Sequence, residues 1–244
     1  MLRLFAADVY DIVIVWMTAR WYQAVFKRLN SGDRILDVGI GTASALARNK
    51  AEMLDRRLSV VGIDYEAAYV RKAEAVLKAE ELWRPAPAGT KGYREGEFYC
   101  HVLQRSIYDD LSDLCFQVGD QPFTGEIPKI IPEELRFDAV YFSGSYSVLP
   151  DPPAALRAVL PLMKSDGRVF ITQTFQKAHS PMMAFFKPLL KYITTIDFGQ
   201  LVTEVELEGL ISSAGGFEVL ENKPIPGSID TRMQTARLVI LKKA

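Results

Sequence analysis

Histidine and cysteine are both rare in this chain, which contains two of each among its 244 residues. Cys100 and Cys115 are too few for a disulfide framework, and their spacing differs from that of a zinc site. We expect both thiols to be reduced in a cytoplasmic protein that binds no metal.

An excess of charge of either sign is also missing. The chain has 29 Lys and Arg against 30 Asp and Glu, which gives a formal net charge of -1. A domain that binds nucleic acid is usually basic, with clustered Lys and Arg. We therefore do not expect nucleic acid as a partner.

Long hydrophobic runs are missing as well. The most apolar early stretch lies within residues 10–19, far short of the roughly 20 residues that a helix needs to cross a bilayer. Asp8 and Asp11 lie close behind Met1, which argues against a signal or transit peptide. We expect a protein without a membrane span.

The composition is that of a globular protein, with 49% hydrophobic and 24% charged residues. Short apolar runs alternate with stretches of helical periodicity. The runs predict strands at residues 34–38, 59–63, 97–103, 137–142, 168–174, 217–220 and 237–241. The periodic stretches predict helices at 6–29, 42–56, 66–82, 107–114, 153–163 and 203–214, with an irregular insertion at 116–135.

This order of elements predicts the fold class. Strands that alternate with helices form a parallel sheet with right-handed crossovers. The last two strands are joined without an obvious helix, which favours an antiparallel hairpin. We predict one α/β domain over residues 1–244, with a doubly wound, mostly parallel seven-stranded sheet, a C-terminal antiparallel hairpin and helices on both faces.

A glycine turn follows the first predicted strand. Gly39 and Gly41 let the backbone turn sharply and let a ligand approach the main chain without a Cβ in the way. Asp64 ends the second strand, where an acid accepts hydrogen bonds from both ribose hydroxyls of a nucleoside. Turn and acid together predict an adenosine-type ligand, which is either a dinucleotide or S-adenosylmethionine.

Two residues distinguish these ligands. The dinucleotide fingerprint has a glycine or alanine at its final position, and this chain has Ser44 there. Asp37 precedes the first glycine by two residues and would repel a pyrophosphate, whereas it suits a ligand with an ammonium group. A cationic ligand without phosphate fits better, although a nucleotide-cofactor oxidoreductase remains an alternative.

Four segments carry a wider pattern: residues 35–41 (ILDVGIG), 60–64 (VVGID), 137–142 (FDAVYF) and 167–171 (GRVFI). In order and spacing they resemble the class I, Rossmann-like S-adenosylmethionine-dependent methyltransferase superfamily. The resemblance implies S-adenosylmethionine as the cofactor. It also implies that Gly39 and Gly41, with Ile40 between them, pass beneath the methionine part of the cofactor, and that Asp37 helps to hold its amino group.

The resemblance assigns roles to five further residues. It implies that Asp64 accepts the ribose hydroxyls and that Tyr65 covers one face of the adenine. Ser106 and Ile107 follow the third strand, at the position that touches the adenine amino group and ring. Ser143 ends the fourth strand, near the methionine moiety and the transferred methyl group.

The chain departs from the family pattern at two positions. Ala43 replaces the third family glycine, and Ser106 stands where the family has an adenine-binding acid. The fourth strand ends in residues 142–146 (FSGSY), not in the Asn/Asp-Pro-Pro-aromatic motif of nucleobase and amide methylation. This ending resembles the small-molecule branch of the superfamily.

Methyl transfer from a sulfonium is a direct displacement, so a catalytic base is optional. His179, after the fifth strand, and Tyr146, after the fourth, are the candidate bases, although a solvated loop residue is the commoner reading of His179. His101 lies within the third strand and is expected to be packed there.

Two apolar segments lie where the superfamily builds substrate recognition. Residues 1–30 are expected to form a helical lid over the cofactor, and residues 175–202 an insertion that shapes the acceptor pocket. Both favour an apolar or lipid-like small-molecule acceptor, while core packing and a weak peripheral membrane contact at 181–193 compete. The aromatic and Met side chains that carry this prediction are Tyr10, Trp16, Trp21, Tyr22, Met182, Met183, Phe185 and Phe186.

The sequence thus predicts a methyltransferase that acts on a small acceptor. The alternatives that stay open are a protein or RNA methyltransferase, the oxidoreductase, and a non-catalytic cofactor-binding module. The oligomeric state is not predicted.

Overall fold

The computed structural model describes residues 15–83, 98–116, 125–177 and 203–244. These residues form a seven-stranded sheet with the strand order β3-β2-β1-β4-β5-β7-β6. Strands β1 to β5 are parallel, and β7 is antiparallel to both β5 and β6. The predicted fold class, with its C-terminal antiparallel hairpin, is therefore confirmed. The strands are β1 (Arg34–Val38), β2 (Ser59–Asp64), β3 (Cys100–Gln104), β4 (Phe137–Ser143), β5 (Met163–Gln176), β6 (Phe217–Pro224) and β7 (Gln234–Lys243).

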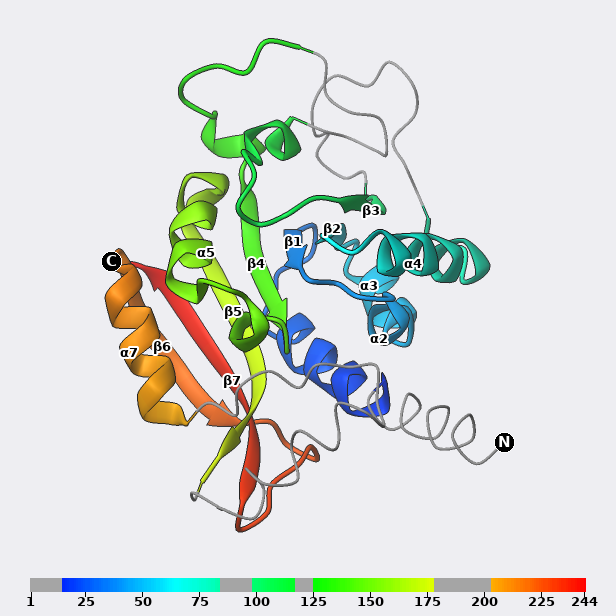
Figure 1. The fold of residues 1–244 in the computed structure, drawn as a ribbon. Coiled ribbons are helices and arrows are strands. Elements are labelled where there is room, and N and C mark those ends of the chain that lie inside the picture. Colours follow the sequence, from blue (N-terminus) through cyan, green and yellow to red (C-terminus); the bar gives the residue numbers. More distant parts are fainter. Residues whose placement is uncertain (1–14, 84–97, 117–124, 178–202) are drawn as a thin grey trace.

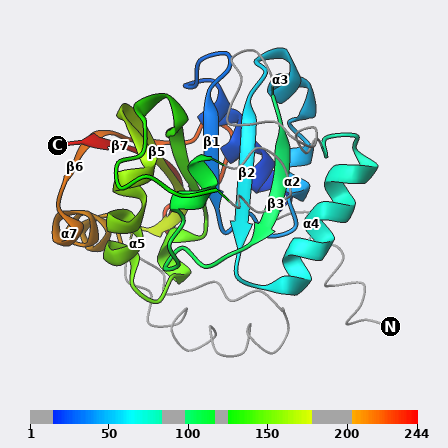
Figure 2. The same ribbon diagram turned by 90° about the horizontal axis from the view of Figure 1, so that it is seen from above.

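Helices cover both faces of the sheet. Figure 1 shows α5 and α7 on the left of the central strands and α3 and α4 on the right, and Figure 2 shows the same separation from above. Each face has its own hydrophobic cluster. The helices are a segment at 15–26, α2 (Ser44–Ala47), α3 (Lys50–Asp55), α4 (Ala67–Ala79), α5 (Pro152–Val159) and α7 (Glu204–Ala214), with 3-10 turns at Ser112–Cys115, Glu133–Leu135, Tyr146–Val148 and Leu160–Leu162.

Side-chain caps fix where two of these helices begin. The Asp151 carboxylate accepts the Ala154 N–H at 2.9 Å, and Pro152 occupies the first turn of α5. Thr203 and Glu206 form a reciprocal capping box at the start of α7. These caps satisfy N–H groups that have no partner within the helix, so they define the boundaries locally.

Some predicted boundaries were wrong. The single helix expected at 42–56 is two helices, α2 and α3, because Asn49 lies between them and its side chain donates to the carbonyls of Ala45 and Ala19. The helix expected at 107–114 is reduced to the 3-10 turn Ser112–Cys115.

The fifth strand is longer than predicted. It begins at Met163, which pairs with Phe137, whereas Arg168 pairs with Ala139. The intervening residues bulge out of the ladder. Gly167 permits this bulge, because a Cβ there would lie 3.0 Å from the Lys164 carbonyl oxygen.

The segment 15–26 packs against the sheet. Trp21 and Tyr22 belong to the hydrophobic core, and the Trp21 indole N–H donates to the Ser228 hydroxyl at 3.0 Å. Trp16 is 50% exposed. Tyr10 lies outside the described residues. The two inner aromatic residues expected in a lid therefore contribute to the core, and the lid itself stays a prediction.

Candidate functional site

The glycine turn follows β1 and is tied to β2. The N–H groups of Gly39 and Ile40 both donate to the Ile63 carbonyl, at 2.8 and 3.2 Å. Gly39 has a φ of +74°, and a Cβ there would lie 2.6 Å from the Cβ of Ser145. Gly41 has a φ of +59°, with no neighbouring atom within 4 Å of the position that a Cβ would take. The fold therefore needs glycine at 39 for packing, and the space beside Gly41 is open to a ligand.

The side chain of Ile40 does not face this open space. It is buried, and a Cβ at Gly62 would lie 2.5 Å from the Cδ1 of Ile40. Ile40 therefore packs onto the backbone of β2, where only a glycine leaves room. Its main chain is the part that remains available to a cofactor.

Ala43 adopts the left-handed conformation, with a φ of 55°. This is the position at which the superfamily has its third glycine. An L-residue in this region costs about 1–2 kcal/mol per residue, because its Cβ approaches the following carbonyl. The turn therefore keeps the glycine geometry although the residue has changed.

Asp64 ends β2 and is tied to the turn. Its Oδ2 accepts the N–H of Gly41 at 3.0 Å, and its Oδ1 accepts the N–H of Glu66, also at 3.0 Å. Burial raises the pKa of Asp64, while these two hydrogen bonds oppose the rise. Each carboxylate oxygen keeps a second lone pair, so the group can still accept hydroxyl donors from a ribose.

Asp37 lies beneath the turn and is fully buried. Its Oδ2 accepts the hydroxyl of Tyr22 at 2.5 Å, whereas its Oδ1 is buried without a hydrogen-bond partner in the described part of the chain. Burial raises the pKa of Asp37 to about 7, the Tyr22 hydrogen bond lowers it, and the negative charge of Asp64 raises it further. A buried carboxylate oxygen that lacks a donor fits the ammonium group of S-adenosylmethionine.

Tyr65 and Ser106 follow the carboxyl ends of the neighbouring strands β2 and β3. Tyr65 is 75% exposed, and its contact with an adenine stays a prediction. Ser106 accepts the N–H of Tyr108 on its hydroxyl and donates its own N–H to the Asp109 carboxylate at 2.9 Å. Asp109 is therefore an acid of the same loop whose carboxylate is bound to the main chain at position 106, and Ile107 is buried.

Ser143 ends β4 and is partly buried at the same edge of the sheet. The next residue, Gly144, has a φ of +70° and turns the chain back, so that Ser145 faces the glycine turn. The Ser145 hydroxyl donates to the Val38 carbonyl at 2.5 Å. The sequence analysis missed Ser145, since only the fold brings it beside Gly39.

Of the two candidate bases, only Tyr146 lies within the described residues. Tyr146 is fully buried beside Phe142, with ring centroids 5.4 Å apart, and burial raises its pKa far above its ordinary value. This environment counts against Tyr146 as a base.

His179 lies outside the described residues, as do the Met and Phe side chains at 182–186. His101 is fully buried in β3, and burial followed by the charge of Arg34 lowers its pKa to about 3, which confirms it as a packed strand residue.

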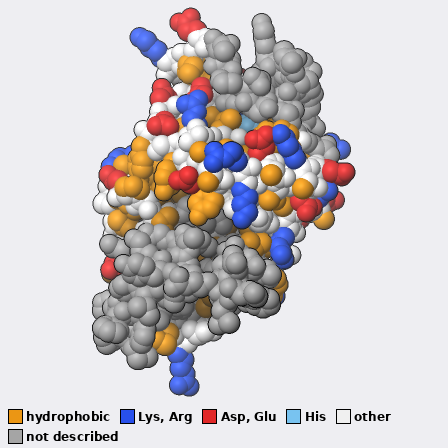
Figure 3. All heavy atoms as spheres, turned by 45° about the vertical axis from the view of Figure 1, so that its right-hand side comes forward, with side chains coloured by type: hydrophobic (Ala, Val, Ile, Leu, Met, Phe, Trp, Pro, Cys, Tyr) orange, Lys and Arg blue, Asp and Glu red, His pale blue; other side chains and the backbone are white. Residues whose placement is uncertain are grey.

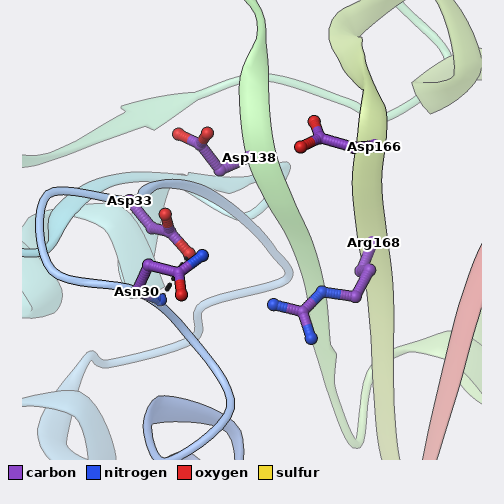
Figure 4. Close-up of a pocket in the computed structure, with 5 residues that line it drawn as sticks. All are labelled: Asn30, Asp33, Asp138, Asp166 and Arg168. Atoms are coloured by element: carbon purple, nitrogen blue, oxygen red, sulfur yellow. Dashed lines mark hydrogen bonds between the residues drawn. The ribbon is translucent and has the colours of Figure 1, made fainter.

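A polar pocket lies at the opposite edge of the sheet (Figure 4). Its lining side chains come from the segment before β1 and from the amino-terminal parts of β4 and β5. Ligands of doubly wound sheets bind at the carboxyl ends of the strands, so this pocket is not the cofactor site. The five lining residues are Asn30, Asp33, Asp138, Asp166 and Arg168.

Three general expectations can be compared with the described residues. Cys100 and Cys115 are buried free thiols, and the described residues hold no cluster of three or more His, Cys, Asp and Glu placed to bind a metal. No helix in the described ranges is long and apolar enough to cross a bilayer. Figure 3 shows Lys, Arg, Asp and Glu side chains interspersed with hydrophobic ones on one face, in keeping with the balanced composition.

Several solved structures share this fold. The mitomycin 7-O-methyltransferase MmcR has a TM-score of 0.59 at 17% identity, over 95% of this chain and 54% of that protein. The 4+2 cyclase SpnF has a TM-score of 0.60 at 15% identity, over 92% and 81%. The O-methyltransferase NcsB1 from neocarzinostatin biosynthesis has a TM-score of 0.56 at 17% identity, over 91% and 53%. This chain therefore spans about half the length of the two O-methyltransferases, and at these identities the likeness shows the fold.

No curated protein sequence matches this chain. A family model, however, matches most of it. The model describes a methyltransferase domain and covers residues 10–222, which include the glycine turn and both aspartates. The chain therefore belongs to the methyltransferase domain family, within the class I S-adenosylmethionine-dependent methyltransferases.

Proposed function

We propose that this chain transfers a methyl group from S-adenosylmethionine to a small apolar acceptor in the cytoplasm. The observation that carries the proposal is Asp37. A carboxylate with one buried oxygen that has no partner among the described residues lies directly before the glycine turn. Such a group favours a cationic ligand and disfavours a pyrophosphate.

The geometry of the site supports the roles proposed for its residues. The backbone at Gly39 and Gly41 borders the open space for the methionine moiety, and Asp37 receives its ammonium group. Asp64 accepts the ribose hydroxyls. Tyr65 covers the adenine.

The remaining predicted contacts lie at the same edge of the sheet. Ser106 and Ile107 border the adenine, and Ser143 lies near the reacting methyl group.

The cofactor, when bound, supplies a methyl group on a sulfonium whose sulfur leaves as a neutral thioether. The protein's part is to align the acceptor with that methyl group and to exclude water. His179 is the candidate base for an acceptor hydroxyl, since the environment of Tyr146 disfavours that residue. The segment 175–202 is proposed to shape the acceptor pocket.

The small acceptor is supported by the comparisons. MmcR is a mitomycin 7-O-methyltransferase, and NcsB1 was solved with S-adenosylmethionine and 2-hydroxy-5-methyl naphthoic acid. Both names refer to small molecules. Residues 142–146 (FSGSY), at the end of β4 and just after it, resemble the small-molecule branch of the superfamily.

The test is isothermal titration of the protein with S-adenosylhomocysteine, with NAD and NADP as controls, together with an Asp64→Ala variant. Micromolar binding of S-adenosylhomocysteine that Asp64→Ala abolishes, with no binding of NAD or NADP, is the expected result. Binding of a nicotinamide cofactor alone would instead indicate an oxidoreductase.

The same protein is then screened with S-adenosylmethionine and aromatic hydroxy acids and quinols, with mass spectrometry to detect a gain of one methyl group. Methyl transfer to one of these compounds supports the proposal. Cofactor binding with transfer only to protein or RNA would contradict the small acceptor, and binding without transfer to any class would indicate a cofactor-binding module.

A further inference from the structure

The helical segment 15–26 reaches the cofactor site through one side chain. Tyr22 is 2% exposed, and its hydroxyl donates to the Oδ2 of Asp37. The two residues are 15 positions apart in the sequence and belong to different elements. Asp37 therefore depends on this segment for its one side-chain hydrogen bond among the described residues.

The surrounding rings hold the Tyr22 phenol in place. Its ring meets the Tyr141 ring edge-on, with centroids 4.9 Å apart and an interplanar angle of 90°. It also meets the Phe26 ring, with centroids 5.9 Å apart. The Tyr141 hydroxyl is itself paired with the Thr172 hydroxyl at 2.8 Å. A ring packed on two sides by aromatic neighbours has little freedom to swing away from Asp37.

Contacts with the connection between β6 and β7 hold the helix itself. Trp21 is bonded to Ser228, and an Arg20 guanidinium N–H donates to the Gly227 carbonyl. Both partners lie in the connection between β6 and β7. The position of the Tyr22 hydroxyl is therefore set by contacts outside the glycine turn.

No positive charge balances Asp37 from within the described residues. The titratable groups that interact with it are Tyr22 from the N-terminal helix, Asp64 from β2, Cys100 from β3 and Tyr141 from β4. All of these are neutral or negative. The unpartnered Oδ1 is thus left without a donor, although a full hydrogen bond is made to Oδ2.

We propose that Tyr22 is a positioning residue for cofactor recognition: its hydroxyl holds Oδ2 of Asp37 and thereby reserves Oδ1 for the ammonium group of the cofactor. The inference rests on the proposed function. Tyr22 donates a hydrogen bond to the carboxylate and is proposed to act through Asp37 and not on the reacting atoms. Through Tyr22, the helical segment 15–26 thereby favours a nucleoside that carries an amino-acid group over a nucleoside that lacks one.

This arrangement makes cofactor affinity depend on pH. A protonated Asp37 cannot pair with an ammonium group, so affinity falls as the pH drops through the pKa of Asp37, which burial raises to about 7. The Tyr22 hydrogen bond favours the ionised form. Its removal raises that pKa and moves the loss of affinity to higher pH.

The test compares two ligands on three proteins between pH 6 and pH 8. S-adenosylhomocysteine carries the ammonium group, and 5′-methylthioadenosine lacks it. The proteins are the wild type, Tyr22→Phe, and the matched control Tyr141→Phe, which also loses one buried hydroxyl but leaves the hydrogen bond to Asp37 intact. Isothermal titration gives the affinities, and thermal unfolding shows that each variant is folded.

We expect Tyr22→Phe to bind S-adenosylhomocysteine about tenfold more weakly at pH 7, with the midpoint of its pH dependence moved up by about one unit. Binding of 5′-methylthioadenosine should change less than about twofold. Tyr141→Phe should leave the midpoint in place. Equal midpoints in all three proteins would overturn the inference, as would an equal loss for both ligands.

A second variant keeps the inference testable should Tyr22→Phe not fold. Asp37→Asn still accepts the Tyr22 hydroxyl but offers no charge, so it should bind S-adenosylhomocysteine weakly at every pH and 5′-methylthioadenosine as the wild type does. Unchanged S-adenosylhomocysteine affinity in Asp37→Asn would contradict the role of Oδ1. Failure of the wild type to bind S-adenosylhomocysteine at all would refute the proposed function, whereas binding that is indifferent to both substitutions would refute this inference alone.

Discussion

Both ends of the sheet carry aspartates, and the two groups differ in how many hydrogen-bond donors and cations the protein supplies to their carboxylates. At the amino end, Asp138 accepts the Arg34 N–H at 2.8 Å and is ion-paired with Lys164. Asp33 accepts the N–H of Asn30 at 2.8 Å. The chain itself supplies donors to these two carboxylates.

At the carboxyl end, the described residues do not supply a hydrogen-bond donor to every carboxylate oxygen. Asp64 receives two backbone N–H groups, and Asp37 receives the Tyr22 hydroxyl on one oxygen only. A carboxylate satisfied by its own protein stabilises the fold, whereas one that retains a buried free oxygen is available to a ligand. Substitutions at the amino end should therefore change stability and leave cofactor affinity intact, whereas those at the carboxyl end should change cofactor affinity, whether or not they also change stability.

The largest expected effect is at Arg34, at the amino end. Its buried guanidinium donates to the carbonyls of Leu114, Cys115 and Leu135. Arg34→Met leaves these carbonyls unpaired and should lower the free energy of unfolding by about 4 kcal/mol. Urea unfolding measures this, and folded Arg34→Met should keep the wild-type affinity for S-adenosylhomocysteine. A large loss of affinity in the folded variant would break the division between the two ends.

Asp37→Asn should have the next largest effect, and with the opposite sign. The folded pKa of about 7 lies above the ordinary value of 3.8, so the folded state holds a proton that the unfolded state releases between these pH values. Stability therefore falls as the pH rises from about 4 to about 7. At about 1.4 kcal/mol per pKa unit the slope amounts to about 4 kcal/mol, so Asp37→Asn should remove it and stabilise the free protein at pH 8 by that amount less the cost of burying the new amide N–H.

Urea unfolding at pH 5 and pH 8 provides the measurement for Asp37→Asn. Asp166→Asn, at the exposed rim of the amino-end pocket, serves as the matched control. Identical slopes in Asp37→Asn and the wild type would show that Asp37 is not the buried acid that limits stability.

The two glycines of the turn should separate stability from binding. Gly39→Ala pushes a Cβ to 2.6 Å from Ser145, so it should lower the free energy of unfolding by about 2 kcal/mol. Gly41→Ala meets no protein atom within 4 Å and should cost about 1 kcal/mol from its positive φ alone. Its methyl group occupies the ligand's space, so affinity for S-adenosylhomocysteine should fall further than stability does. Equal losses at both positions would argue against open space at Gly41.

Ala43→Gly is the smallest expected effect and should be favourable. Glycine relieves the strain of a φ of 55° but adds freedom to the unfolded chain, so the net gain should be about 0.5 kcal/mol. Thermal unfolding is the measurement, with Ala47→Gly in the buried helix α2 as a control that should lose stability. A loss at both positions would contradict the strain assigned to Ala43.

Much of the fold could be predicted because its signals are local. The buried strands β1 and β2 are short and mostly apolar, and the glycines and Asp64 lie within a few residues of the strand ends. The break between α2 and α3 was missed, since it depends on an Asn49 side chain that reaches back to two carbonyls.

The contacts that complete the site could not be predicted. Ser145 donates to the Val38 carbonyl, which lies 107 positions earlier in the sequence. Tyr22, in the helical segment 15–26, donates to Asp37 in β1. Neither pair leaves a spacing pattern in the sequence, because both arise only when the sheet brings its strand ends together. The burial of Tyr146 could not be predicted for the same reason, because its position after β4 suggested the site, whereas packing places its ring in the core.

The central claim is that the carboxyl end of the sheet, and not the amino end, binds the cofactor. The most direct measurement is the affinity for S-adenosylhomocysteine of two matched variants, Asp64→Asn and Asp166→Asn. We predict that Asp64→Asn binds at least about tenfold more weakly than the wild type and that Asp166→Asn binds as the wild type does. Full affinity in Asp64→Asn, or a loss confined to Asp166→Asn, would contradict the account.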